Sequence, residues 1–257
     1  MARGINRGPW AALHLFLARA PTLCHDRPMP AYVERATLHP KGFSETLELP
    51  YGLRASEVKA AIDDIYDFLY NVNRFLTERG WDRLEETLSA ATFSGVMSEL
   101  VVEGVSKRSA TIIKNRYHNG RPDLVPRGMY EADACLRGDD GIEVKASRWS
   151  NGWQGHNAEE GWIMICQYYI DRDTTPIESR TATRIDRIMC AQLDESDWSF
   201  SGRKEGSRRT PTASIKRSGV LKLAENAVYL DPTYVPRPTP KRKATAAPVT
   251  EREAGSP

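Results

Sequence analysis

The spacing of apolar residues changes near residue 120, and this change is the strongest constraint on the fold. Before it, apolar residues recur at three- and four-residue steps, the period of an amphipathic helix. They are Val58, Ile62, Ile65, Leu69, Val72 and Leu76. Ser56 is suited to cap this helix and Gly80 to end it. The sequence therefore predicts a long helix, followed by others at about 82–90 and 94–105.

Beyond Asn119-Gly120 the pattern is typical of short strands. Met129–Leu136 and Ile142–Ser147 flank a Gly-Asp-Asp-Gly turn, which predicts a hairpin. Trp162–Ile170 is predicted to be a core element, and Thr183–Leu193 and Leu221–Tyr229 to be further strands or short helices. Helices followed by strands predict an α/β (α+β) class with a helical N-terminal part.

The 257 residues suit one large domain with appendages. Residues 1–28 are predicted to be a disordered leader or extension, and 29–120 a mainly helical N-terminal part. Residues 121–232 are predicted to form a sheet region with a basic loop. Residues 233–257, rich in Pro, Thr, Ala and Lys, are predicted to be a disordered basic tail.

The net charge of +2 hides an asymmetry along the chain. From Ser201 to the end there are 12 Lys and Arg against 5 Asp and Glu, a net of +7, which leaves −5 for the remainder. A basic region on a mildly acidic body fits contact with a polyanion, and it also fits a solvated tail.

Two absences narrow the class of protein. No apolar run reaches eighteen residues, so no membrane association is expected. The four cysteines form no CxxC pair, which argues against a disulfide framework and a structural zinc site. This cysteine usage favours a reducing, cytoplasmic compartment.

The most informative segment surrounds Glu143 and Lys145. Residues two apart in a strand share a face, so these two side chains point the same way while Ile142 and Val144 point into the core. A three-residue turn ending in a left-handed Gly141 would bring Asp133 to the same face, whereas a two-residue turn would turn it away. The Asp-Asp-Gly order favours the first arrangement.

Two carboxylates on one face repel each other unless a cation neutralises them. Mg²⁺ prefers oxygen ligands and also binds phosphate oxygens. Lys145 is placed to orient or deprotonate a water and to stabilise developing negative charge. The pattern therefore indicates hydrolysis of a phosphodiester.

An acid, a hairpin and then Glu143-Val144-Lys145 resemble the PD-(D/E)XK nuclease superfamily, which includes many type II restriction endonucleases. The resemblance covers roughly residues 90–170. It implies a mixed central sheet flanked by helices and an endonuclease that cleaves DNA to 5′-phosphates, with Mg²⁺ as cofactor and Mn²⁺ as a substitute. It also implies that Glu143 is the second acid and Lys145 the lysine.

Two residues compete for the first acid. Asp133 is favoured as the metal ligand beside Glu143 because of the hairpin geometry. Asp123 follows Pro122 as in the family motif, 20 residues before Glu143, and would otherwise lie at the site edge or in a turn. A glutamate on the preceding helix often completes such sites, and Glu99 is the candidate, with Glu103 second.

The acid-x-Lys pattern occurs twice in the chain. Glu57-Val58-Lys59 has the same letters as the candidate segment, but it lies in the first turn of a predicted helix. Residues two apart on a helix diverge, so this copy is interpreted as structural.

Double-stranded DNA is the expected partner, with a homodimer to cut both strands. Candidate DNA-binding residues carry base-stacking, hydrogen-bonding or cationic groups. They are Arg148, Trp153, Gln154, His156, Asn157, Arg203, Lys204, Arg208, Arg209 and Thr210. Alternative interpretations are a Gly-rich loop whose tryptophans cover the core, and a flexible basic loop. Two alternative functions stay open: a non-catalytic DNA-binding module of the same fold, and a repair or single-strand nuclease.

Overall fold

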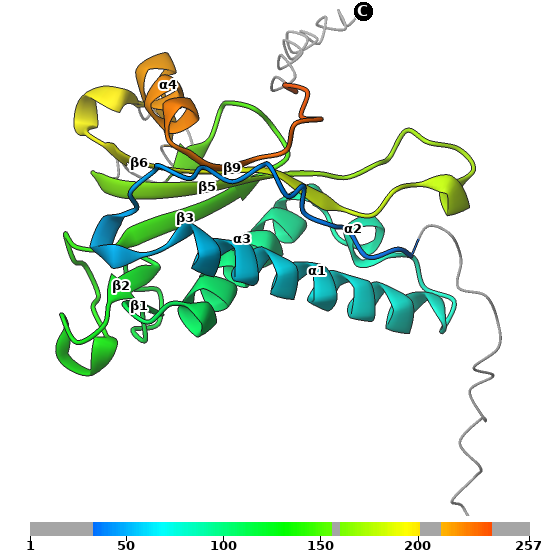
Figure 1. The fold of residues 1–257 in the computed structure, drawn as a ribbon, viewed down its shortest axis with the longest axis horizontal. Helices are drawn as coiled ribbons and strands as arrows, with labels where there is room; N and C mark the ends of the chain where they lie inside the picture. The colour runs from blue at the N-terminus through cyan, green and yellow to red at the C-terminus, as the bar shows by residue number, and fades with distance from the viewer. Residues whose placement is uncertain (1–32, 156–159, 201–211, 238–257) are drawn as a thin grey trace, which may run out of the picture. The chain divides into compact units, whose positions relative to one another are not determined.

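A six-stranded sheet forms the centre of the computed structural model, which describes residues 33–155, 160–200 and 212–237 (Figure 1). The strand order is β1-β2-β3-β5-β6-β9. The strands are β1 (Ile112–Lys114), β2 (Leu124–Pro126), β3 (Ile142–Ser147), β5 (Gly161–Tyr169), β6 (Arg184–Leu193) and β9 (Ala227–Leu230). β3 and β5 are parallel and the other neighbours antiparallel. A mixed sheet with helices confirms the predicted α/β class.

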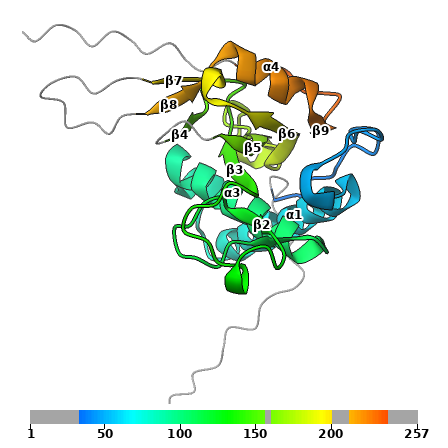
Figure 2. The ribbon, with the colours of Figure 1, turned by 90° about the vertical axis from the view of Figure 1, so that its left-hand side faces the viewer.

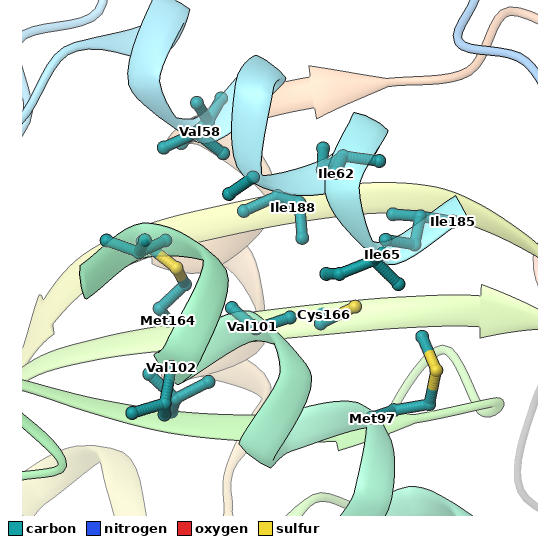
Figure 3. Close-up of a cluster of buried hydrophobic side chains, with 14 of the residues drawn as sticks. Val58, Ile62, Ile65, Met97, Val101, Val102, Met164, Cys166, Ile185 and Ile188 are labelled. Carbon is teal, nitrogen blue, oxygen red and sulfur yellow. The ribbon is translucent and has the colours of Figure 1, made fainter. Parts of the chain in front are cut away.

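Two long helices, α1 (Ala55–Thr77) and α3 (Ala90–Arg108), cover one face of this sheet (Figure 1). Four residues of the predicted apolar stripe are buried in the main core: Val58, Ile62, Ile65 and Leu69. Its last two, Val72 and Leu76, are half-buried and lie outside this cluster. Figure 3 shows Ile62 and Ile65 of α1 and Val101 of α3 pointing toward Cys166 and Ile188 of the sheet. The helical periodicity therefore predicted both the helix and its buried face.

The helix ends differ from the prediction. Arg54, not Ser56, precedes α1, and the Glu57 side chain accepts a hydrogen bond from the Arg54 backbone N–H at 3.0 Å. The second helix, α2 (Leu84–Thr87), has only four residues. The third begins earlier than predicted because Ser89 caps it, accepting a hydrogen bond from the Thr92 N–H.

The opposite face of the sheet carries α4 (Arg217–Glu225) and a small three-stranded sheet of β4 (Gln154–Gly155), β8 (Ala213–Ile215) and β7 (Trp198–Phe200) (Figure 2). They enclose a second apolar cluster. Its buried members are Trp153, Ile163, Ile165, Met189, Ala191, Leu193, Trp198, Ala213, Ile215 and Leu223. The predicted 221–229 element divides into the end of α4 and β9.

The predicted hairpin is wrong. Residues 129–136 form a loop with a short 3-10 helix at Glu131–Asp133, and the antiparallel neighbour of β3 is β2, with Leu124 opposite Ile142. Ala132 and Asp133 have φ angles of 53° and 55°. This left-handed conformation interrupts an extended strand. The turn itself keeps one predicted feature, since Gly141 has a positive φ of 144°.

Part of the predicted disordered tail has a defined position. The backbone N–H of Ser150 donates to the Arg237 carbonyl at 2.8 Å, and the Arg237 guanidinium pairs with Asp186. The predicted leader at residues 1–28 and the rest of the tail lie outside the described residues. Of the helices in the described part of the chain, none is both long and apolar enough to cross a membrane.

Candidate active site

The start of β2 and the middle of β3 bring an aspartate and a glutamate together. Leu124 lies opposite Ile142, and continuing this antiparallel register by one residue places Asp123 opposite Glu143. Cross-strand partners share a face of the sheet. The backbone N–H of Val144 donates a 2.8 Å hydrogen bond to Asp123 Oδ2, which fixes this carboxylate against β3. The pairing of β2 with β3 therefore assembles the two acids.

Lys145 completes the group. Its Nζ lies 3.2 Å from Glu143 Oε1, and the two side chains are only 15% and 13% exposed. Ile142 and Val144 are buried in the main core. The predicted alternation along β3 is thus confirmed, and Glu143 and Lys145 extend together from one side of the strand.

The pKa of the Asp123 carboxyl is raised well above that of an ordinary aspartate. Burial, followed by the negative charge of Glu143, raises its pKa to about 7, while the Val144 N–H and Lys145 oppose the rise. The neighbouring cation therefore does not compensate the two acids fully. A divalent cation would do so, since Mg²⁺ is often held by one or two carboxylates and several waters. Among the described residues, no cluster of three or more His, Cys, Asp or Glu side chains is arranged to hold a metal.

Asn115 fixes the backbone around Asp123 through hydrogen bonds. Its buried side-chain Nδ2 donates to the carbonyls of Pro122 at 3.0 Å and Cys135 at 2.8 Å. Its backbone N–H donates to the Asp123 carbonyl at 2.8 Å. Sequence reasoning missed this residue, because an isolated asparagine in a loop carries no periodic or motif signal.

Two open hollows each have one acid of the pair in their lining. One, of about 700 Å³, has Asp123 in its lining together with Glu99, Lys114, Arg116 and His118; we call it the Asp123 hollow. The other, of about 610 Å³, has Glu143 in its lining together with Arg121, Arg137 and Trp162; we call it the Glu143 hollow. Asn119 lines both, so the two hollows adjoin each other next to the candidate site.

Asp133, the favoured first acid, is held elsewhere. Its Oδ1 accepts a hydrogen bond from the Gly128 N–H at 2.7 Å, and its Oδ2 lies 4.0 Å from the Arg116 guanidinium. The hairpin that would have carried it to Glu143 does not form, because Asp133 lies in the left-handed turn described above. The structure instead brings Asp123, the alternative acid, to Glu143 and Lys145.

Glu99 lies beside the group rather than within it. Its carboxylate is 2.8 Å from Lys114 Nζ, and its side chain is 69% exposed. Its negative charge also raises the pKa of Asp123, but by less than burial and the charge of Glu143 do. Glu103, the second helix candidate, pairs with Lys107 at 3.3 Å.

The predicted DNA-binding residues include one core residue, two residues in other described positions and seven residues outside the described part of the chain. Trp153 is a core residue: it is 4% exposed, and its indole N–H donates to the Trp149 carbonyl at 3.1 Å. Gln154 is exposed on β4, and the Arg148 guanidinium stacks 4.6 Å from the Trp149 ring centroid. The remaining candidates lie outside the described residues: His156, Asn157, Arg203, Lys204, Arg208, Arg209 and Thr210.

The second Glu-Val-Lys copy differs in its surroundings, as predicted. Glu57 is buried and accepts hydrogen bonds from the backbone N–H groups of Arg54 and Ala110. Lys59 is exposed on α1. The same three letters therefore serve a helix start at one place and a strand with a paired acid and lysine at the other.

Comparisons of the chain with protein-family models, with curated proteins and with solved structures found no match.

Proposed function

We propose that this chain is a Mg²⁺-dependent endodeoxyribonuclease of the restriction-endonuclease type. The observation that carries the proposal is the group on β2 and β3. Asp123, with its pKa raised to about 7, lies beside Glu143, and Glu143 pairs with Lys145 at 3.2 Å. Two acids and a lysine in this order on adjacent strands form the pattern that the PD-(D/E)XK resemblance implies, with Asp123 in place of Asp133.

The donor set fits the proposed cation. Asp123 and Glu143 supply two carboxylates, and burial, followed by the negative charge of Glu143, raises the pKa of Asp123. Mg²⁺ suits this oxygen set, and Mn²⁺ accepts the same ligands. When bound, such an ion would polarise a phosphodiester and lower the pKa of a coordinated water.

The chain's own groups have distinct roles in this reaction. The Lys145 ammonium orients the attacking water and stabilises the negative charge that develops on the phosphorus oxygens. Glu143 keeps this ammonium in place, and the Val144 N–H keeps the Asp123 carboxylate in place. The water oxygen bonds to phosphorus and releases a proton to solvent while the bond from phosphorus to the 3′ oxygen breaks. The 3′ oxygen takes up a proton from solvent, which leaves a 5′-phosphate and a 3′-hydroxyl.

The substrate proposed is double-stranded DNA cut at internal positions. The two hollows share Asn119, and their linings contain Arg116 in one hollow and Arg121 and Arg137 in the other. Adjoining hollows of this size leave room for DNA beside the acid pair, which supports internal cleavage. We further propose a homodimer, because two sites are needed for two strands, and a cytoplasmic location, in keeping with the cysteine usage.

The decisive experiment uses the two Glu-Val-Lys copies as matched variants. Plasmid and phage DNA are digested with Mg²⁺, Mn²⁺ or EDTA by the wild-type protein, Lys145→Ala and Lys59→Ala. We expect wild-type and Lys59→Ala to cut with either ion and not in EDTA. Lys145→Ala should lose at least about 10²-fold in rate because the ammonium that orients the water and stabilises the developing negative charge is gone. A wild-type protein that cuts none of these DNAs, modified or unmodified, would overturn the proposal in favour of a non-catalytic DNA-binding module.

A second pair of variants identifies the first acid. Asp123→Asn should abolish cleavage, whereas Asp133→Asn should keep it, provided that thermal denaturation shows both variants folded. The opposite result would return the role to Asp133. Discrete fragments from wild-type digests would favour a restriction endonuclease over a repair or single-strand nuclease.

A further inference from the structure

The Asp123 hollow contains a second cationic group that the proposed chemistry does not use. Lys114 ends β1, and its Nζ lies 2.8 Å from Glu99 Oε2. Both side chains are largely open to solvent, at 43% and 69% exposure. The Glu99 carboxylate, opposed by partial burial, raises the pKa of Lys114, so the ammonium is fully charged at neutral pH.

Lys114 lies close in the fold to the candidate catalytic acid. It pairs with Leu124 in the β1–β2 register, and Leu124 directly follows Asp123. The next residue, Asn115, donates its backbone N–H to the Asp123 carbonyl. Lys114 and Asp123 also share the lining of one hollow, with Arg116 and His118 on its loop side.

We propose that the Asp123 hollow binds the phosphodiester backbone of a DNA strand next to the phosphate that is cut, with Lys114 as its anchoring cation. Glu99 is the counter-ion that Lys114 leaves when DNA binds. This inference rests on the proposed function for the identity of the polyanion. It assigns Lys114 and Glu99 roles that the resemblance does not: Glu99 acts on a lysine and not on a metal ion.

Replacing the Glu99 carboxylate by a DNA phosphate at Lys114 costs little free energy. Exposed ion pairs contribute little to stability, because water screens them and ordering two long side chains costs entropy. A phosphate has the same sign of charge as the Glu99 carboxylate and offers the ammonium equivalent acceptor oxygens. Binding to DNA also releases condensed counterions, which a carboxylate partner does not provide.

The two cations in this lining also favour a phosphate over a metal ion at the position of Glu99. Lys114 already occupies the Glu99 carboxylate at hydrogen-bond distance, and Arg116 adds a further cation in the same lining. A metal ion bound at Glu99 would have to displace the ammonium and then lie among these positive charges. A phosphate group can instead take the place of the Glu99 carboxylate at the Lys114 ammonium, with the Arg116 guanidinium in the same lining.

The test measures DNA binding without cleavage. Fluorescence anisotropy of a short labelled DNA duplex is recorded in EDTA, and in Ca²⁺ in parallel, over a range of salt. Lys114→Ala should weaken binding about 5- to 10-fold and lower the slope of log K against log salt by about 0.9, the loss of one phosphate contact. Lys107→Ala is the matched control, since it removes an exposed lysine paired with Glu103 outside this hollow.

The counter-ion role has its own variant. Glu99→Gln should tighten binding about 2- to 5-fold in EDTA, because Lys114 no longer leaves a charged partner, and Glu99→Gln/Lys114→Ala should not show this gain. Equal binding by Lys114→Ala and Lys107→Ala would overturn the proposal, as would weaker binding by Glu99→Gln. Cleavage is scored separately: a protein that binds as described but never cuts refutes the proposed function alone. Wild-type protein that binds no DNA in either buffer refutes the phosphate site.

Discussion

Asp123 Oδ2 accepts a 2.8 Å hydrogen bond from the backbone N–H of Val144, the residue between Glu143 and Lys145. This single bond ties the first acid to the strand that carries the second acid and the lysine. Because it uses a backbone donor, it positions the carboxylate without using either functional side chain of β3. Its consequences can be measured through stability, cation binding and the response to substitution.

The raised pKa of Asp123 makes stability depend on pH. A carboxyl with a folded-state pKa of about 7 binds a proton more tightly when folded than when unfolded, near pH 4. The contribution of this carboxyl to the free energy of unfolding is therefore fully present below about pH 4. It falls as pH rises to about 7 and is absent above that. Asn cannot ionise, so in EDTA only the wild-type should lose this contribution. The difference in unfolding free energy, Asp123→Asn minus wild-type, should therefore increase by on the order of 1–2 kcal/mol between pH 5 and pH 8.

Urea unfolding at the two pH values measures this difference. Glu103→Gln, a change at an exposed helix position, serves as the control and should show no such growth. A constant offset between Asp123→Asn and wild-type at pH 5 and pH 8 would contradict the assignment of a raised pKa to Asp123.

Cation binding should follow the same titration with the opposite sign. Mg²⁺ binds the ionised carboxylate, so its affinity should rise by up to about 10-fold per pH unit below pH 7 and level off above it. Thermal shift measurements with Mg²⁺ should show a larger stabilisation of the wild-type protein at pH 8 than at pH 6. Asp123→Asn should lose most of the shift at both pH values. An equal shift for this variant and wild-type would place the cation elsewhere.

The turn before β3 leaves no room for a side chain. Gly141 has a φ of 144°, and a Cβ there would lie 2.3 Å from the Leu124 carbonyl oxygen and 2.3 Å from Pro122 Cγ. Gly141→Ala should therefore cost on the order of 2–4 kcal/mol in unfolding free energy and displace the segment that carries Asp123.

Gly95→Ala is the matched control. It lies on α3 with nothing within 4 Å of its added Cβ, and it should stabilise the protein by about 0.5–1 kcal/mol. Chemical denaturation compares the two variants. Equal stability for Gly141→Ala and wild-type would show that the turn can move without cost.

Trp153 and Gln154 are neighbours with opposite environments. Trp153 is buried in the second apolar cluster, and Gln154 is exposed on β4. Trp153→Ala should lower the free energy of unfolding by about 3–5 kcal/mol through the cavity that it leaves. Gln154→Ala should change it by no more than about 0.5 kcal/mol. Thermal or urea unfolding distinguishes the two, and a small effect of Trp153→Ala would reopen its interpretation as a DNA-contacting side chain.

Local patterns in the sequence predicted the elements that depend on local physics. The three- and four-residue spacing from Val58 onward predicted α1 and its buried stripe. Alternation predicted that Ile142 and Val144 are buried while Glu143 and Lys145 stay together on the other side. The Asp-Asp-Gly order predicted the left-handed Gly141.

The pairing of strands could not be predicted in the same way. β2 has only three residues, too few to show a period of two, and its partner β3 begins sixteen residues after β2 ends. The turn argument assumed that residues 129–136 form the strand that pairs with β3, and this assumption selected Asp133 over Asp123. The role of Asn115 depends on loops that meet only in the folded chain, so no local pattern indicated it.

The alternation of buried and functional side chains along β3 restricts which changes in sequence length the protein tolerates. Glu143 and Lys145 extend from one side of β3, whereas Ile142 and Val144 are buried in the main core. Adding or removing one residue between Ile142 and Lys145 would therefore drive an ammonium or a carboxylate into the hydrocarbon interior. A conservative substitution keeps this alternation, whereas an insertion or deletion within the strand reverses it. Variation in length among sequences descended from this chain is therefore expected in the 129–140 loop and never within the strand itself.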